Sequence, residues 1–326
     1  MTLRRETRAT DALFVGAVFL DIILDGLERF PAPGEEVWAA RRAVSAGGVA
    51  NNAVAAARLG LRTVLVAELG GDALGAIARA ELEREPGLDL SGVCTVPGRE
   101  TPLTVAAPID GDRSFLSQGA LTLPPVTQTA DAAAAFLTLT AESPTWLDHV
   151  RSSGARVFAD VAWDQHTGWD AQLLDQLAGV DVFLPNATEA MAYTRTTTPE
   201  AAARELASRV PLVVVTCGPD GVIAQEGPSG RQLRIPAVRV PTTDATGAGD
   251  VFASALMCAT LTPEPLTDAL RFASLCAALS TRVLGGAAGA PDLDELDRWA
   301  RAHAAESDDY RFLPEYLDRL RHRRSV

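Results

Sequence analysis

The segment Asp244-Ala-Thr-Gly-Ala-Gly-Asp250 combines residue types whose spacing suits phosphoryl transfer. Gly247, Ala248 and Gly249 lie directly before an apolar stretch that is typical of the first turns of a helix. Small residues at a helix start let backbone N–H groups surround an anion, and the helix dipole adds positive potential there. Asp250 lies in the same turn, where its carboxylate could accept the proton of an attacking hydroxyl. The segment therefore predicts an anion hole beside a general base.

The same segment allows two other interpretations. Gly247, Gly249 and Ala253 fit the dinucleotide-binding pattern G-x-G-x-x-A, and Asp268 follows about twenty residues on, as that pattern requires. However, that pattern directly follows an apolar strand, whereas the polar, turn-like segment 241–246 precedes this one. A glycine-rich loop without a function is also common, so the rest of the chain must decide.

Composition narrows the classes of function. A chain of 326 residues, 47% of them apolar, is long enough for one large α/β domain or two smaller ones. The net charge of −13 argues against a nucleic-acid partner. All 29 basic residues are Arg, which excludes a Walker A lysine and a Schiff-base lysine. Phosphate binding must then come from backbone amides, Arg or a metal ion.

The cysteines and the N-terminus indicate a cytoplasmic protein. No segment is long enough to cross a membrane. The apolar run 12–20 follows three arginines like a signal peptide, but Asp21 and Asp25 interrupt it and no cleavage pattern follows, so a first core strand is expected. Four widely spaced cysteines without C-x-x-C pairing are typical of buried thiols in a reducing compartment: Cys94, Cys217, Cys258 and Cys276.

Short apolar runs typical of buried strands alternate with helical stretches, which predicts an α/β fold whose mostly parallel sheet is covered on both faces. The strand-like runs are residues 13–18, 63–67, 155–159, 180–184 and 212–216. The Ala-rich stretch 52–59 is helical and ends at Gly60.

Two segments interrupt this alternation. Segment 19–45 carries prolines and a glycine between strand-like pieces, and segment 101–118 reads as a hairpin with a turn at 110–112. They could extend the edge of the sheet or form a small β lid over the strand ends, where open α/β sheets bind ligands. A lid edge often pairs with a second copy, which suggests a homodimer. Arg113 on the hairpin could reach an anionic substrate or a γ-phosphate, although a lone Arg is usually just exposed surface.

A second constellation, Gly47-Gly48 followed by Asn51-Asn52, stands at another helix start. It could be a turn with an N-cap. Alternatively, the glycines allow close approach of a ligand, and one Asn bonds a substrate hydroxyl.

A third constellation consists of residues that follow strand-like runs. Asn186 and Glu189 have the spacing of a capping box, and the same spacing would aim both side chains at a crevice that could hold hydrated Mg²⁺. The stretch Thr216-Cys-Gly-Pro-Asp-Gly221 is a glycine-rich turn. Asp160 begins a segment expected to line the pocket, in which Trp163 is either a pocket or a core residue.

Together, and in this order, these motifs resemble the ribokinase-like (PfkB) carbohydrate kinase family over nearly the whole chain. The run D-A-T-G-A-G-D departs from the family's D-T-x-G-A-G-D only at Ala245. The resemblance implies a ribokinase-like three-layer sandwich in one domain, residues 1–326, with a lid formed by about 19–45 and 101–118. It also implies an enzyme that binds ATP and Mg²⁺ and phosphorylates a small sugar.

The resemblance implies a role for each matching residue. Asp250 would be the base and residues 247–249 the anion hole, while Glu189 with Asn186 would organise Mg²⁺ through water. The nucleotide would lie against Thr216, Gly218 and Gly221. Asp244 and Thr246 match residues beside a monovalent-cation site, which makes K⁺ a candidate activator. The proposed substrate-binding residues are Asp21, Gly47, Gly48, Asn51, Asn52, Arg113 and Asp160.

Three departures from the family pattern affect the choice of substrate. Phe19 replaces an Asn that often precedes the match of Asp21, and Ser274 stands where relatives often have Asn near the adenine. The early motif is one residue short, and counting back from Gly60 favours Asn51 over Asn52.

The resulting prediction is an ATP-dependent sugar kinase that transfers the γ-phosphate to a primary hydroxyl, with Asp21 anchoring the sugar ring and Asp250 facing the protruding oxygen. Ketohexoses, pentoses and 2-keto-3-deoxy sugar acids remain open. The alternative is a nucleoside kinase, in which Phe19, Trp38 and Phe115 would stack on the base. A sugar sensor without activity and an NAD-linked oxidoreductase are the other classes considered.

Overall fold

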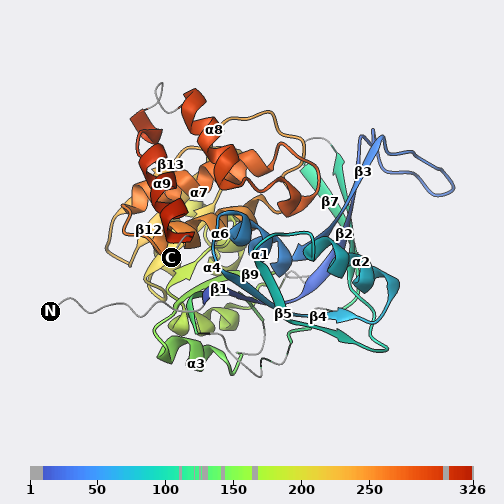
Figure 1. Cartoon of the computed structure of the whole chain (residues 1–326), viewed down its shortest axis with the longest axis horizontal. Coiled ribbons are helices and arrows are strands. Elements are labelled where there is room, and N and C mark those ends of the chain that lie inside the picture. The colour runs from blue at the N-terminus through green and yellow to red at the C-terminus, as the bar shows by residue number, and fades with distance from the viewer. Residues whose placement is uncertain are drawn as a thin grey trace.

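The computed structural model describes residues 10–109, 112–120, 122–124, 126, 131–140, 144–163, 168–303 and 308–324, and for 108, 109, 112, 113 and 324 it describes only the backbone. Two β-sheets and the helices around them make up this part of the chain (Figure 1).

The larger sheet has nine strands in the described residues, in the order β13-β12-β11-β10-β9-β8-β1-β4-β5. All neighbours from β11 to β5 are parallel, and β12 and β13 add two antiparallel strands at one edge. The strands are β1 Thr10–Val15, β4 Thr63–Gly70, β5 Leu88–Val96, β8 Ala132–Leu139, β9 Arg156–Val161, β10 Val182–Phe183, β11 Leu212–Thr216, β12 Val222–Glu226 and β13 Gln232–Ile235.

Helices cover both faces of this sheet because its strands are apolar on both sides. Along β1, Ala12 and Phe14 pack into one hydrophobic cluster, and Leu13 and Val15 pack into the other. The first cluster lies under α1 Val49–Arg58, α2 Ala73–Leu82, α6 Ala248–Thr260, α7 Leu266–Ser280, α8 Leu293–His303 and α9 Leu313–Arg324. The second lies under α3 Leu147–Ser152, the 3₁₀ helix η1 Ala171–Gly179, α4 Ala187–Thr194 and α5 Pro199–Leu206.

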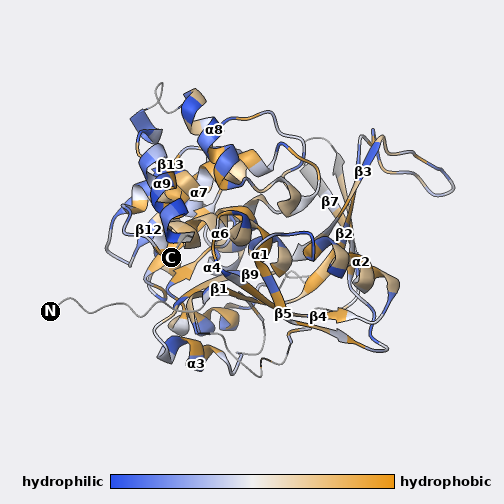
Figure 2. Ribbon diagram, in the orientation of Figure 1, coloured by the Kyte–Doolittle hydropathy of each residue, from blue (hydrophilic) through white to orange (hydrophobic). Residues whose placement is uncertain are grey.

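Short 3₁₀ turns complete the described elements: η2 Gly218–Asp220, η3 Gly286–Gly289 and η4 Asp308–Tyr310. Hydrophobic residues concentrate in the central strands, and the outer helices α8 and α9 carry much of the hydrophilic surface (Figure 2). Among the described helices, none combines the length and the apolar character that a membrane span needs. The predicted three-layer α/β fold with a mostly parallel sheet is confirmed.

The smaller sheet has the order β3-β2-β6-β7 and stands to one side of the larger one (Figure 1). It consists of β2 Val18–Asp25, β3 Arg41–Gly48, β6 Leu103–Ile109 and β7 Asp112–Gln118. These strands fall in the segments expected to leave the main alternation, and β6 and β7 pair antiparallel as the predicted hairpin. Residues 110 and 111 of its turn lie outside the described residues.

Candidate active site

The backbone turns sharply at Gly247, immediately before α6. Its φ of 71° is left-handed, and an added Cβ would lie 3.2 Å from Gly286 Cα and 3.3 Å from Asn51 Nδ2, so the position requires glycine. No side chain of the described residues caps the first turn of α6. The amide of Ala248 donates to the Ala245 carbonyl at 3.3 Å, and Gly249 is exposed. The helix start therefore presents backbone amides that a bound anion could share.

Hydrogen bonds to the buried Asp244 side chain hold the backbone of the turn before α6. Asp244 Oδ1 accepts from the Thr246 amide at 2.9 Å, and its Oδ2 accepts from the Gly285 amide at 3.1 Å. Asp244 is buried, and Thr246 Oγ1 is buried without a hydrogen-bond partner among the described residues. The Thr246 hydroxyl oxygen could therefore act as a ligand for a cation in this buried position.

Asp250 lies half-buried in the first turn of α6, where α1 supplies hydrogen bonds to it. Asn51 Nδ2 donates to Asp250 Oδ2 at 3.0 Å, and Asn52 Nδ2 donates to the Asp250 carbonyl at 3.2 Å. Of the two adjacent asparagines, Asn51 thus contacts the side chain of the predicted base. The predicted contact of either residue with substrate stays a prediction.

Asp21 lies on β2, with its carboxylate directly over Gly47 of the neighbouring strand β3. Even the farther oxygen, Oδ1, would be only 2.8 Å from a Cβ at Gly47, so a side chain there would displace the carboxylate. Burial, together with the negative charges of Asp250 and Asp244, raises the pKa of Asp21 to about 7. Gly48 ends β3 with a φ of 64°, and a Cβ there would overlap the Ala17 carbonyl oxygen.

Two more acidic groups lie at strand ends of the large sheet: Asp160 near the end of β9, and Glu189 in the helix after β10. Burial and then the charge of Asp250 raise the pKa of Asp160 well above its ordinary value, and its shielded Oδ1 has no partner among the described residues. Burial raises the pKa of Glu189 to about 7, against the lowering effect of hydrogen bonds with Asn186. The charge of Glu189 also contributes to the shift at Asp160. The charge of Asp250 therefore contributes to raising the pKa of three other carboxyl groups, those of Asp21, Asp160 and Glu189.

The capping-box interpretation of Asn186 and Glu189 is confirmed. The Asn186 amide donates to Glu189 Oε2 at 2.9 Å, and the Glu189 amide donates to Asn186 Oδ1 at 2.9 Å. The Mg²⁺ interpretation of the same pair stays a prediction. Asn186 also forms a parallel β-bridge with Thr216, which brings the two motifs together.

The predicted nucleotide-binding residues besides Asn186 lie at the end of β11, in the turn that follows it and on α7. Gly218 and Gly221 both have positive φ, of 55° and 87°, in the turn between β11 and β12. A Cβ at Gly218 would meet nothing within 4 Å, whereas one at Gly221 would overlap the Ile235 carbonyl oxygen. Packing alone therefore explains why residue 221 is glycine, without any contact to a nucleotide. Ser274 is buried on α7, and its Oγ has no partner among the described residues.

The structure describes only some of the side chains that were expected at the pocket. Arg113 belongs to strand β7, but its side chain lies outside what the structure describes. Trp163 is 59% exposed and packs edge-to-face on Trp169 with 5.2 Å between ring centroids, so it is not a core residue. Asp164, which ends the predicted pocket segment, lies outside the described residues.

The segment 285–290 also belongs to this site, although the sequence analysis did not identify it. Gly285 donates to Asp244, and the Ala287 amide donates to Asn51 Oδ1 at 3.1 Å. The glycine pair at 285 and 286 was the available signal, because both residues have positive φ.

A helix start without a side-chain cap in the described residues, with a carboxylate in its first turn and in a three-layer α/β fold, suits a small-molecule phosphotransferase. A family model described as pfkB family carbohydrate kinase matches residues 9–293, and the chain belongs to this family. The predictions of the family and of an ATP-dependent kinase are confirmed.

Individual relatives align with most of this chain. The chain is 31% identical over 297 residues to a nucleoside kinase from Methanothermobacter thermautotrophicus, covering 87% of this chain and 94% of the relative. It is 30% identical over 312 residues to a ribokinase from Arabidopsis thaliana, covering 88% and 80%. A solved structure of Arabidopsis thaliana ribokinase complexed with ribose and ATP has a TM-score of 0.72 at 27% identity and covers 87% of this chain and 96% of that one.

Proposed function

We propose that this enzyme transfers the γ-phosphate of ATP to a primary hydroxyl of a small, uncharged sugar. The observation that carries the proposal is the position of Asp250, which Asn51 holds at 3.0 Å in the first turn of a helix that has no side-chain cap in the described part of the chain. A base and a set of anion-binding amides thereby share one turn.

In this mechanism Asp250 accepts the proton of the attacking hydroxyl as its oxygen bonds to the γ-phosphorus, while the bond from that phosphorus to the β,γ-bridging oxygen breaks and ADP leaves. The amides of residues 247–249 donate to the oxygens of the transferring phosphoryl group, where negative charge must be stabilised without a lysine. Asp21 accepts a hydrogen bond from a ring hydroxyl and thereby turns the primary hydroxyl toward Asp250.

The proposal includes two metal sites. Glu189 and Asn186, with the unpartnered Oδ1 of Asp160 beside them, offer the oxygen ligands that Mg²⁺ prefers. When bound, Mg²⁺ neutralises phosphate charge. The buried Thr246 Oγ1 next to Asp244 suits a monovalent cation such as K⁺.

An uncharged acceptor is favoured because the described residues around Asp21 supply negative charge. The charges that influence the Asp21 carboxyl are those of Asp250 and Asp244, and both are acidic. A sugar acid would add a further negative charge beside the carboxyl groups of Asp21, Asp250 and Asp244. Ribose is the first candidate, since a relative of 27% identity was solved with ribose and ATP.

A nucleoside kinase remains the second candidate function. The nucleoside kinase relative is 31% identical over 87% of the chain, and Trp38 and Phe115 are exposed rings, 80% and 52%, on or beside the smaller sheet. Such rings suit stacking on a base.

The smaller sheet is proposed to be a lid within one kinase domain, residues 1–326. Val18, Leu20 and Ala46 of that sheet belong to the same hydrophobic cluster as α1 and α6, which supports one continuous core. Strand β7 is an edge strand with Phe115 and Leu116 exposed, and a second copy could pair there. Light scattering of the purified protein would test for the dimer.

ATP consumption with ribose, fructose, a 2-keto-3-deoxy sugar acid and adenosine tests the proposal directly. We expect turnover with an uncharged sugar, and phosphorylation of adenosine alone would replace the sugar kinase by the nucleoside kinase. Asp250→Asn should lower kcat by about 10²- to 10⁴-fold while ATP affinity changes little. Normal turnover by this variant would show that Asp250 is not the base.

A further inference from the structure

Helix α1 holds the segment 285–290 at two places. Near its start, Asn51 Oδ1 accepts from the Ala287 amide at 3.1 Å. At its last residue, Arg58 Nη1 lies within hydrogen-bond distance of three carbonyl oxygens, those of Ala287 at 3.1 Å, Ala288 at 2.8 Å and Ala290 at 3.0 Å. Asn51 and Arg58 are seven residues apart, which places them on one face of the helix, two turns apart.

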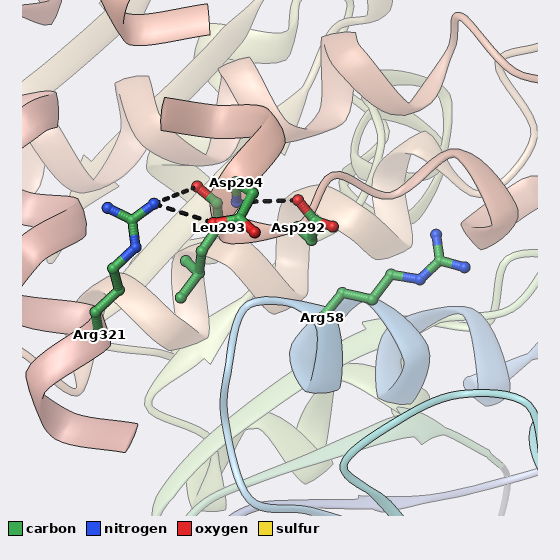
Figure 3. Close-up of a pocket in the computed structure, with 5 residues that line it drawn as sticks. All are labelled: Arg58, Asp292, Leu293, Asp294 and Arg321. Carbon is green, nitrogen blue, oxygen red and sulfur yellow. Dashed lines mark hydrogen bonds and ion pairs between the residues drawn. The ribbon is translucent and has the colours of Figure 1, made fainter. Parts of the chain in front are cut away.

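The guanidinium of Arg58 is itself held in place. Its Nε and Nη2 donate to Glu85 Oε2 and Oε1, at 2.9 and 2.6 Å, as a bidentate ion pair. Both side chains are mostly buried, with 24% and 16% exposed. Arg58 projects from α1 at the edge of a cavity of about 170 Å³, whose other lining residues include Asp292 and Arg321 (Figure 3). Because the ion pair with Glu85 fixes the planar guanidinium, Nη1 points at the three carbonyl oxygens.

The position of segment 285–290 determines which end of the Asn51 carboxamide faces Asp250. Because the Ala287 N–H occupies Asn51 Oδ1, the amide NH₂ must point to Asp250 Oδ2, where it donates at 3.0 Å. The opposite orientation would set the Asn51 oxygen against a carboxylate and would leave the Ala287 amide facing a donor. A shift of the segment therefore removes a donor from the predicted base.

We propose that Arg58 is a positioning residue for phosphoryl transfer: it holds segment 285–290 so that Ala287 orients Asn51, and Asn51 in turn holds Asp250. This inference rests on the proposed function, in which Asp250 is the base. Arg58 bonds segment 285–290, and Asn51 bonds both that segment and Asp250, so the effect of Arg58 on Asp250 is proposed to pass through Asn51.

Arg58→Gln should lower kcat by about 10- to 100-fold with a KM for ATP within about twofold of wild type, because a base displaced by about 1 Å costs up to about 10²-fold in rate. The kcat of Arg58→Lys, which keeps one cationic donor, should lie between those of wild type and Arg58→Gln. The matched control is Arg62→Gln, because Arg62 also donates a forked pair to a carboxylate, but that of Asp11 on β1, away from segment 285–290. The control should keep wild-type kcat.

A double-mutant cycle with Asn51→Ala tests the route of the effect. If Arg58 acts through Asn51, Arg58→Gln should lower kcat less than about twofold further in the Asn51→Ala background, since coupled residues are not additive. The same loss in both backgrounds, or a lower unfolding temperature with unchanged kcat, would overturn the proposal. If Arg58→Gln fails to fold, Arg58→Lys and Glu85→Gln enter the same cycle.

Hydrogen exchange of segment 286–288 adds a readout that does not need turnover. The Ala287 amide should exchange faster in Arg58→Gln than in wild type or Arg62→Gln, and equal exchange would overturn the proposal. The two hypotheses therefore fail separately. An inactive wild type refutes the proposed function, whereas an active wild type with an additive cycle refutes only the role of Arg58.

Discussion

Substitution of Gly47 by Ala is the sharpest test of the proposed sugar anchor, because it moves Asp21 without changing its chemistry. Gly47 lies in strand β3 with an ordinary backbone conformation, so Ala adds no backbone strain. Its Cβ would overlap the Asp21 carboxylate, and even the farther oxygen would be at 2.8 Å. Ordinary contacts begin at about 3.5 Å, so the carboxylate must move by roughly 1 Å or more.

The magnitude follows from the hydrogen bond that such a shift breaks. A hydrogen bond to a charged group is worth about 1.5–3 kcal/mol, which corresponds to about 10- to 100-fold in affinity. Gly47→Ala should therefore raise the KM for the sugar by about 10- to 100-fold and leave the KM for ATP near its wild-type value. Initial rates at saturating ATP over a range of sugar concentrations measure the effect.

Gly98→Ala is the control for a general loss of stability. Gly98 has a φ of 75°, and an added Cβ would meet nothing within 4 Å, so Ala strains the backbone without touching the site. Its sugar KM should stay unchanged. If Gly47→Ala folds and also keeps the wild-type sugar KM, Asp21 does not bind the sugar.

Three further predictions concern the acidic groups. The pKa of Asp21 is about 7 in the folded protein and 3.8 for an ordinary Asp, so between these values the folded form binds a proton that the unfolded form has lost. The free energy of unfolding should therefore fall as the pH rises from about 4 to 7. Urea unfolding at pH 5 and pH 8 should show a smaller fall for Asp21→Asn than for wild type. Glu189→Gln should raise the Mg²⁺ concentration needed for half-maximal activity, and an unchanged Mg²⁺ titration would remove Glu189 from the metal site. A 2-keto-3-deoxy sugar acid should have a kcat/KM at least about 10-fold below that of an uncharged sugar, and Asp21→Asn should narrow the gap; equal values for both substrates would contradict the charge argument.

The motif at 244–250 and most buried strands of the large sheet were predictable because their signals are local. Strand β8, Ala132–Leu139, was not among the predicted strands. Four of its residues are Ala, which favours helices and is depleted in strands. Pairing with β1 on one side and β9 on the other overrides that preference, because small residues suit a strand that is buried on both faces.

The site itself was predicted in its parts but not in its connections. Asn51 and Asn52 are identical neighbours, and the structure distinguishes them because Asn51 bonds the side chain of Asp250, 199 residues away, whereas Asn52 bonds its carbonyl. Segment 285–290 reaches Asn51 across 236 residues, and no spacing rule in the sequence reports such a contact. In the sequence, Arg58 is one of many arginines and lies near a helix end, where a basic residue would stabilise the helix dipole. Its three carbonyl contacts depend on how two distant segments pack.

The predicted base and anion hole lie on elements that are tied to each other. Ser254 Oγ of α6 donates to the Asn52 carbonyl of α1 at 2.8 Å, and Asn52 donates back to the Asp250 carbonyl. With Asp244 holding Gly285, these bonds join the two helix starts and segment 285–290 into one unit. Asp21 belongs to the other sheet, whose strands pair only with one another in the described residues. The predicted base and the predicted sugar anchor thus lie on different elements that share one connection, because β3 of the smaller sheet runs directly into α1, whose Asn51 holds Asp250.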